Sequence, residues 1–287
     1  MKNVDNVAYK DKFIAFVDIL GFKKMVASSE AGTGLSLNEL LKMQEELGKF
    51  EDWDRIRTHG PTICPFSPFI QHDLDFQLTQ ISDCVVVSCE VSPAGVINLI
   101  GHCWGVVMKL LLKGIMCRGY ITRGTVYHNG TRIMGTGYQE AYCREASVKA
   151  FSQKADERGT PFVEVDKVVY DYVMNCEDTC VRAMFSRYVK KDGDTSALFP
   201  FKRLTHSFLI DETFDPEKEK QSNEDLRQMI RSVKSQVTAF IDNSNHSAVN
   251  KAKHYLSVLD AQLAECDETD KAIDMLCSPF SRSRPKR

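Results

Sequence analysis

Short apolar runs rich in β-branched and aromatic residues recur through the first two thirds of the chain, and such runs are typical of buried strands. Asp18 closes the first of them. Polar turns separate two pairs of runs, one centred on Asp83 and one with the sequence His-Asn-Gly-Thr at residues 128–131, so each pair predicts a hairpin. The predicted strands cover residues 13–19, 76–83, 84–88, 115–127, 132–134, 162–165 and 168–172.

Longer segments between these runs carry apolar residues at helical spacing, which predicts helices that cover the sheet. Ser36 and Glu39 have capping-box spacing, and Pro93 and Gly114 stand where another helix begins and ends. Strands and helices in this order predict an α+β fold, a sheet with covering helices, extended by a C-terminal pair of helices. The predicted helices cover residues 36–56, 94–113, 138–157, 223–241 and 246–265.

The composition shifts to polar helix formers in the last quarter of the chain. We therefore expect residues 1–215 to form one domain and residues 216–287 to form a helical extension that ends in a basic tail. The charge run at residues 215–220 is typical of a solvated linker, and the tail at residues 282–287 of a disordered end.

The charge balance limits the kinds of ligand. With 37 Lys and Arg against 39 Asp and Glu, the chain has a formal net charge of −2, whereas a dedicated nucleic-acid binder normally carries a basic excess. We therefore expect no nucleic-acid binding. A small anionic ligand held by a few local charges remains compatible with this balance.

Membrane and disulfide signals are weak. No apolar stretch reaches the roughly 18–20 residues that span a bilayer, and the N-terminal sequence lacks the apolar core of a signal peptide. The ten cysteines are scattered through apolar runs and fit neither a disulfide framework nor a structural zinc site. These features predict a cytoplasmic protein without a membrane span.

Two aspartates occupy matching positions, Asp18 at the end of the first strand and Asp83 in the turn of the next hairpin. Either alone is explained most simply as a residue that caps a turn. If neighbouring strand ends bring them together, the two carboxylates and a backbone carbonyl, such as that of Ile19, form an oxygen-rich site for hard divalent cations.

Four short motifs occur in order along the chain: FVDILGF at residues 16–22, ISD at 81–83, RGYITRG at 118–124 and GTGYQEA at 135–141. Together they resemble the ordered motifs of class III nucleotidyl cyclases, and most closely those of the bacterial pyrimidine cyclases of the Pycsar anti-phage systems. The resemblance covers residues 13–157, about half of the chain.

The resemblance implies a ferredoxin-like sheet with covering helices, in which two chains pair head to tail and form two active sites at their interface. Asp18 and Asp83 would hold two Mn²⁺ or Mg²⁺ ions, assisted by the carbonyl of Ile19. Gly21 and Phe22 would present backbone N–H groups to the phosphates of the nucleotide.

The base-recognition positions of the family differ in this chain. Purine-specific members have a lysine six residues before the second metal aspartate and an aspartate three residues before the glycine of the last motif. Gln77 and Arg132 occupy these positions here, and their donors suit the carbonyl-rich edge of uracil. The resemblance therefore predicts a uridylate cyclase that converts UTP to cyclic UMP and pyrophosphate, with cyclic CMP synthesis as the alternative.

The late helix also departs from the wider class. The asparagine and arginine that contact ribose and the reacting phosphates there fall on Gln139 and Cys143 here. Gln139 is assigned to nucleotide binding. The transition-state guanidinium must come from another residue, with Arg118 as the catalytic candidate and Arg123 and Arg144 as alternatives.

Two wider expectations follow from the resemblance. In the family, the cyclic nucleotide is a second messenger that reaches an effector protein during phage infection, so the partner would be contacted through this messenger. Because Cys143 stands where the wider class has its arginine, a catalytically silent nucleotide-binding sensor of the same fold is a second hypothesis.

Overall fold

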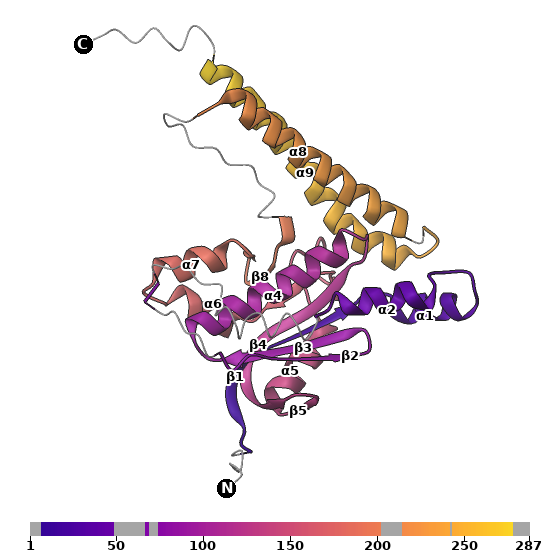
Figure 1. Cartoon of the computed structure of the whole chain (residues 1–287), viewed down its shortest axis with the longest axis vertical. Helices are drawn as coiled ribbons and strands as arrows, with labels where there is room; N and C mark the ends of the chain where they lie inside the picture. Colours follow the sequence, from indigo (N-terminus) through magenta and orange to yellow (C-terminus); the bar gives the residue numbers. More distant parts are fainter. Residues whose placement is uncertain (1–6, 49–66, 69–73, 202–213, 242, 278–287) are drawn as a thin grey trace. The chain divides into compact units, whose positions relative to one another are not determined.

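The computed structural model describes residues 7–48, 67–68, 74–201, 214–241 and 243–277. The chain divides into two compact units, one of residues 1–111 and 115–199 and the other of residues 112–114 and 200–287. The first unit holds the sheet and its covering helices (Figure 1).

The sheet of the first unit has the strand order β2-β3-β1-β4-β6-β8-β7, with β5 paired to β4. Its pairings are antiparallel except that β4 and β6 run parallel. The strands are β1 (Lys10–Ile19), β2 (Gln77–Ile81), β3 (Cys84–Glu90), β4 (Cys117–Asn129), β5 (Arg132–Met134), β6 (Val163–Val165), β7 (Val189–Asp192) and β8 (Thr195–Leu198). Both predicted hairpins and the predicted strands up to residue 165 are confirmed, and β1 lies between β3 and β4. The strand predicted at residues 168–172 is wrong, because Asp166 caps a helix there by accepting from the N–H of Val168.

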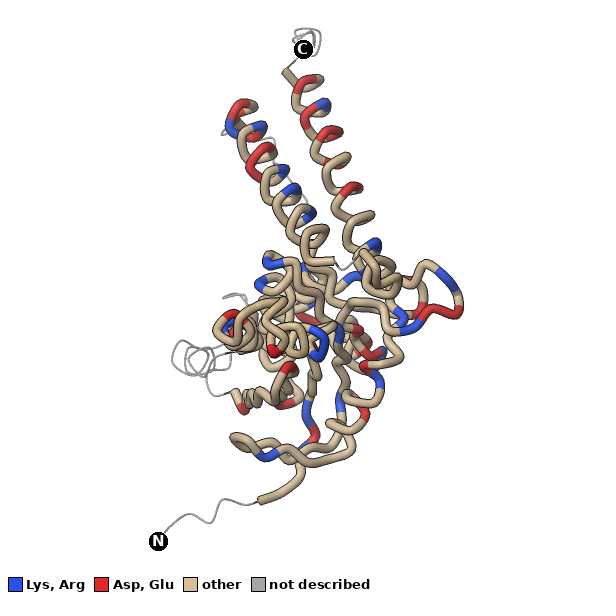
Figure 2. The backbone as a smooth tube through the Cα atoms, turned by 90° about the vertical axis from the view of Figure 1, so that its right-hand side faces the viewer, with Lys and Arg blue, Asp and Glu red and all other residues tan. Residues whose placement is uncertain are grey.

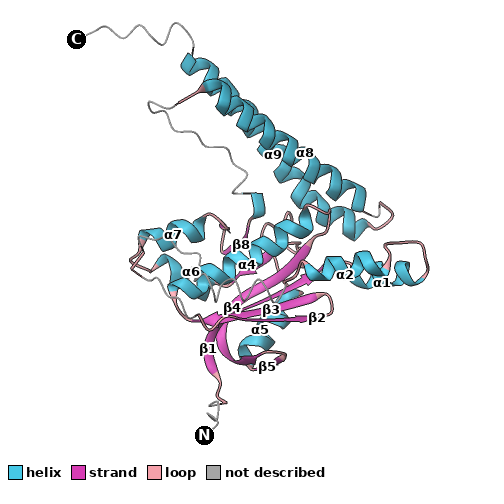
Figure 3. Cartoon of the chain, viewed as in Figure 1, coloured by secondary structure: helices cyan, strands magenta, loops and turns pink. Residues whose placement is uncertain are grey.

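Helices lie on both faces of the strands, as Figure 3 shows for α4 and α5. Ile14 and Phe16 of β1 pack with Ala141 of α5 in one apolar cluster. Because side chains alternate along a strand, the residues between them turn to the opposite face, where α4 contacts β1 and β3. The helices of this unit are α1 (Phe22–Glu30), α2 (Leu37–Glu45), α4 (Pro93–Leu111), α5 (Thr136–Glu145), α6 (Lys167–Met174) and α7 (Thr179–Ser186).

The capping box predicted at Ser36 is present, because the Ser36 side chain accepts from the Glu39 backbone and the Glu39 side chain accepts from Ser36. The helix is shorter than predicted and ends at Glu45 rather than near residue 56. Its last turn tightens, and Gly48 then takes a φ of 148°, a conformation that does not continue a helix. Residues 49–56 lie outside the described part of the chain.

The helix predicted over residues 138–157 is also shorter and ends at Glu145. The chain then turns so that the backbone N–H groups of Lys149 and Ala150 donate to the carboxylate of Glu164 on β6, each at 2.9 Å. Phe151 follows with a φ of 56°. The carboxylate that holds this turn comes from a strand later in the chain, so helical spacing alone does not reveal the turn.

The second unit contains two long helices, α8 (Pro216–Phe240) and α9 (His246–Cys277), which confirm the C-terminal pair. Helix α8 begins seven residues before its predicted start, and α9 continues twelve residues beyond its predicted end. Arg227 is buried between them and bonds to Asp267 and Asp270. Acidic and basic residues are interspersed along both helices (Figure 2). The expected solvated linker at residues 215–220 is wrong, because Asp215 caps α8 by accepting from the N–H groups of Glu217 and Lys218.

Helix α4 corrects the expectation that no apolar stretch is long enough to span a bilayer. Among the described residues it is the one helix long and apolar enough to cross a membrane, with 19 residues, and 72% of its apolar window is buried inside the protein. Such burial is typical of a core helix. All nine cysteines in the described ranges carry free thiols; Cys64 and the basic tail at residues 282–287 lie outside those ranges.

A buried histidine predicts the acid stability of the first unit. Burial, and then the charge of Lys12, lower the pKa of His128 to about 4, whereas Asp75 raises it. The unfolded chain therefore binds the extra proton first, and stability present above pH 6.5 is lost as the pH falls towards 4, by about 3 kcal/mol. Urea unfolding at pH 7.5 and pH 4.5, compared between the wild type and His128→Gln, separates this contribution from those of other groups that titrate in the same range. His128→Gln should be less stable at pH 7.5 but should lose less on acidification, and an equal loss in both proteins would contradict the assignment.

Candidate active site at the end of the central strand

The two predicted metal aspartates lie together at one end of the sheet. Asp18 is the ninth residue of β1 and is paired in register with Cys84 on β3 and Arg118 on β4. Asp83 lies in the turn between β2 and β3, and its backbone carbonyl accepts a hydrogen bond from the N–H of Ile19 at 3.0 Å. This bond ties the turn to the end of β1 and places the two residues side by side.

The neighbouring carboxylates perturb the pKa of Asp18. Burial first, then the negative charges of Asp83 and Glu145, raise the pKa of Asp18 to about 7, and a hydrogen bond with Asp83 adds to this rise. The positive charge of Arg118 opposes it. A half-buried pair of like charges at a strand end is electrostatically unfavourable without a cation.

The donor set fits divalent metal ions in its chemistry. Two carboxylates with an excess of negative charge form a site that hard cations such as Mg²⁺ and Mn²⁺ prefer. Within the described ranges, no group of three or more His, Cys, Asp and Glu side chains could hold a metal ion. Asp18 and Asp83 would therefore supply the side-chain ligands, and backbone or substrate oxygens would complete the coordination.

Arg118 lies across from Asp18 and forms an ion pair with Glu145, the last residue of α5. Both side chains are largely buried, with exposed fractions of 17% for Arg118 and 10% for Glu145. Gly159 packs against the guanidinium: a Cβ at this position would lie 2.7 Å from Nη1 of Arg118. The arginine is thus held beside the carboxylate pair by a partner that fixes its orientation.

The two other arginine candidates are held elsewhere. Arg123 pairs with Asp11 at 2.7 Å, and Arg144 pairs with Glu140 one turn earlier in α5. Arg144 is exposed, as is Cys143, at the position where the wider class has its arginine. Of the three candidates, Arg118 is the one that is paired in register with Asp18.

Gly21 precedes the first helix directly after the aspartate strand. It has a φ of 82°, in the left-handed region, and is the N-cap of α1. A Cβ there would meet only Cε of Met25, at 3.9 Å, so backbone conformation rather than crowding requires glycine. Phe22 is buried, so its backbone N–H, not its ring, is the group suited to an anion at this helix start.

The predicted nucleotide-recognition residues lie away from the aspartates in the same chain. Gln77 pairs with Ser88, four positions along β3 from Cys84, which is about 13 Å at about 3.3 Å per residue. Gln77 lines a cavity of about 440 Å³, whereas Arg132 lines a neighbouring cavity of about 530 Å³. Gln139 is exposed on α5. One chain therefore brings together Asp18, Ile19, Asp83, Arg118 and the Gly21 turn, but not Gln77, Arg132 or Gln139.

Glu145 is a site residue that sequence reasoning missed. Its signal is its place on α5, where Gly137, Ala141 and Glu145 recur every four residues and are all buried. A carboxylate on the buried face of a helix requires a partner, and Arg118 supplies it. Cys84 also faces this end of the sheet, but burial and nearby carboxylates raise its thiol pKa to about 12, so it remains protonated.

Comparisons with solved structures return matches among nucleotide cyclases. The catalytic core of a rhodopsin-guanylyl cyclase with converted specificity, in complex with ATPαS, has 14% identity and a TM-score of 0.37 over 58% of this chain and 82% of its own. Two structures of a bacterial light-regulated adenylyl cyclase also have 14% identity, with TM-scores of 0.39 and 0.36. Each aligns with 77% of this chain, which spans 57% and 58% of their respective lengths.

No protein-family model and no curated protein sequence matches the chain. At 14% identity and TM-scores below 0.5, the matches to solved structures say nothing about chemistry, which must be argued from the site.

The raised pKa of Asp18 predicts a stability change with a defined sign. Ionisation of Asp18 opposes folding, so its contribution should lower the stability of the wild type as the pH rises from about 4 to 7 and should level off above 7. Asp18→Asn should raise the Tm at pH 8 by roughly 2–5 °C and reduce this pH dependence. Mn²⁺ should raise the Tm of the wild type but have little effect on the variant.

A matched control is Asp171→Asn, which removes an exposed carboxylate paired with Lys167 on α6. It should respond to Mn²⁺ like the wild type. Equal stabilisation of the wild type and Asp18→Asn by Mn²⁺ would place the metal elsewhere.

Proposed function

We propose that the chain is a metal-dependent nucleotidyl cyclase that converts UTP to 3′,5′-cyclic UMP and pyrophosphate. The observation that carries this proposal is the juxtaposition of Asp18 and Asp83, held by the Ile19 N–H bond to the Asp83 carbonyl at 3.0 Å. The ordered sequence motifs around these residues support the same reaction class.

The residues divide the chemistry between them. Asp18, Asp83 and the carbonyl of Ile19 would hold two Mn²⁺ or Mg²⁺ ions. When bound, such ions supply Lewis-acid charge to phosphate oxygens and lower the pKa of an attacking hydroxyl. The turn at Gly21 leads the chain into α1, so the backbone N–H groups of Gly21 and Phe22 would bind the phosphates. Arg118 would stabilise the charge that develops on the reacting phosphate.

We propose a head-to-tail homodimer for this reaction. The aspartate pair and Gln77 lie at opposite ends of the paired strands of one chain, about 13 Å apart along β3. A two-fold axis across the sheet would place the Gln77 end of one chain against the aspartate end of its partner, so that each site takes residues from both. Gln139 and Arg132, both exposed, are available to a partner chain.

The biological role rests on the resemblance to pyrimidine cyclases. We propose that the chain is cytoplasmic and that its cyclic nucleotide serves as a second messenger in anti-phage defence, reaching an effector protein without direct contact. Cyclic CMP is the alternative product, because the cavity that Gln77 lines is large enough for either pyrimidine base.

The substrate is tested directly by product mass. Purified chain incubated with Mn²⁺ and each of ATP, GTP, CTP and UTP should yield cyclic UMP fastest. Asp18→Ala and Asp83→Ala should each reduce the rate by about 100-fold or more, because each removes a metal ligand. Asp171→Ala should retain the wild-type rate. The absence of cyclic product from all four nucleotides would refute the cyclase.

The composite site is tested by mixing inactive variants. Asp18→Ala removes the metal end, and Gln77→Trp fills the cavity end. Co-expression should restore about a quarter of the wild-type activity, because random pairing gives half of the dimers one intact site each. Asp18→Ala with Arg118→Met should stay inactive, since both lie at the same end. Restoration by the second pair but not the first would contradict the head-to-tail arrangement.

The second candidate is a catalytically silent nucleotide sensor, favoured by exposed Cys143 at the class arginine position. Nucleotide that raises the Tm and is recovered unchanged would support this alternative.

A further inference from the structure

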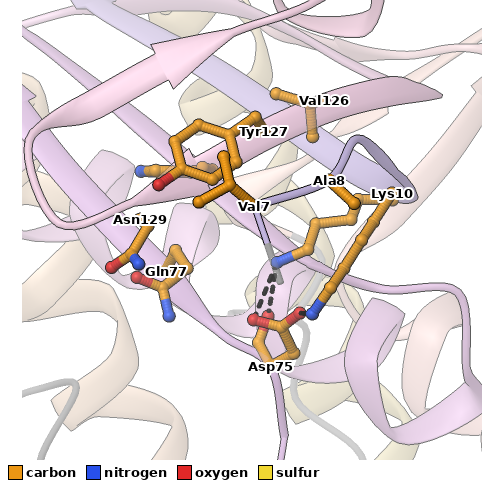
Figure 4. A pocket seen from close by; sticks show the side chains of 10 residues that line it. Val7, Ala8, Lys10, Asp75, Gln77, Val126, Tyr127 and Asn129 are labelled. Atoms are coloured by element: carbon orange, nitrogen blue, oxygen red, sulfur yellow. Dashed lines mark hydrogen bonds and ion pairs between the residues drawn. The ribbon is translucent and has the colours of Figure 1, made fainter. Parts of the chain in front are cut away.

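The cavity of about 440 Å³ at the Gln77 end contains an unusual set of charged groups. Lys10, Lys12, Asp75 and Gln77 all line it, together with the apolar walls that Val7, Val126 and Tyr127 supply (Figure 4). A volume of this size is typical of a pocket for a small organic ligand. The polar groups therefore decide which ligand the cavity would select.

Asp75 is the centre of this set. Its carboxylate bonds to Nζ of Lys10 at 2.8 Å and to Nζ of Lys12 at 2.9 Å, and Lys12 also donates to the Asp75 carbonyl at 3.1 Å. Lys12 is 2% exposed, whereas 30% of the Asp75 side chain and 62% of the Lys10 side chain are exposed. Lys12 thus holds Asp75 from the buried side. The remaining hydrogen-bonding positions of Asp75 and Lys10 face the cavity.

Asp75 is ionised at neutral pH. Burial by itself raises the pKa of Asp75, but the hydrogen bonds and charges of Lys10 and Lys12 outweigh burial and hold the pKa below its usual value. The pKa of Lys10 is raised in return by the same pair. The cavity therefore offers a carboxylate acceptor next to an ammonium donor.

Gln77 supplies a second donor. Its Oε1 accepts a hydrogen bond from the N–H of Gly130 at 3.3 Å, so its amide nitrogen is the group suited to donate to a ligand. Figure 4 shows Asp75 between Gln77 on one side and Lys10 on the other. The order across the cavity is donor, acceptor, donor.

We infer that Gln77, Asp75 and Lys10 form the site that selects uracil, with the Asp75 carboxylate accepting from the N3–H and the two donors bonding O4 and O2. Uracil presents acceptor, donor, acceptor along this edge, whereas N3 of cytosine is an acceptor that Asp75 would repel. Lys12 is a positioning residue that fixes Asp75. This inference rests on the proposed function and replaces Arg132, in the neighbouring cavity, as the partner of Gln77 in base selection.

The test uses nucleosides, whose binding requires neither metal nor turnover. By saturation-transfer NMR on the full chain, uridine should bind, and N3-methyluridine, which lacks the N3–H, should not. Asp75→Asn and Lys10→Met should each weaken uridine binding roughly tenfold or more, because each removes a hydrogen bond to a charged group. Cytidine binding should not fall in parallel.

Turnover provides the second measurement. The ratio of kcat/KM for UTP to that for CTP should fall roughly tenfold in both variants. Lys234→Met is the matched control, because it removes an exposed lysine paired with Asp260 in the other unit and should change neither ratio nor binding. Circular dichroism checks that each variant folds. If Asp75→Asn unfolds because Lys12 is left buried and unpaired, the result for Lys10→Met decides the test.

The outcomes separate the inference from the proposed function. Wild-type protein that binds uridine in this way but cyclises no nucleotide would refute the cyclase and retain the uracil site. Cyclic UMP synthesis with an unchanged UTP to CTP ratio in both variants would overturn the uracil site and retain the cyclase. Equal binding of uridine and N3-methyluridine would also overturn the uracil site.

Discussion

The register of β1 between β3 and β4 is the constraint on which the candidate site depends. Asp18 stands opposite both Cys84 and Arg118, and the N–H of Ile19 is bound to the Asp83 carbonyl at 3.0 Å. A slip of one residue would turn Asp18 to the α4 face and move it away from the α5 face, where Arg118 and Glu145 lie. Seven consecutive pairings with β3 and ten with β4 fix this register.

The same register places unfavourable charges together. Asp18 and Asp83 repel each other near Glu145, and Arg118 offsets only part of this repulsion, since the pKa of Asp18 still rises to about 7. The cost is tolerated because the middle of β1 is buried on both faces, with Phe13, Ala15 and Val17 on one face and Ile14 and Phe16 on the other. Local rules are commonly broken in this way where a cation or a substrate is to be bound.

The sheet separates two kinds of chemistry at its two ends. One end has the carboxylate pair with Arg118, and the other has the cavity in which Lys10 and Lys12 hold Asp75. No single chain brings these ends together within the part that the structure describes, because strand length separates them. Two chains related by a two-fold axis would bring one end of each sheet next to the other end of its partner's sheet. For this reason we propose that the functional unit is a dimer.

The sequence by itself determined β1 to β6, most of the helices and the pair Asp18 and Asp83, but not β7 and β8, because hydrophobic period and turn residues are local signals. It did not determine where the helices after Ser36 and Gly135 end, because the turns that follow them, with Gly48 at a φ of 148° and with Lys149 and Ala150 bonded to Glu164, interrupt no local pattern.

Only the tertiary structure showed that Glu145 pairs with Arg118, and that Asp75 rather than Arg132 shares a cavity with Gln77. Arg118 and Glu145 are 27 residues apart, and Asp75 is held beside Gln77 by Lys10 and Lys12, which are 65 and 63 residues away from it. Strand pairing and helix packing bring them together, and no local pattern in the sequence records which distant side chains will meet.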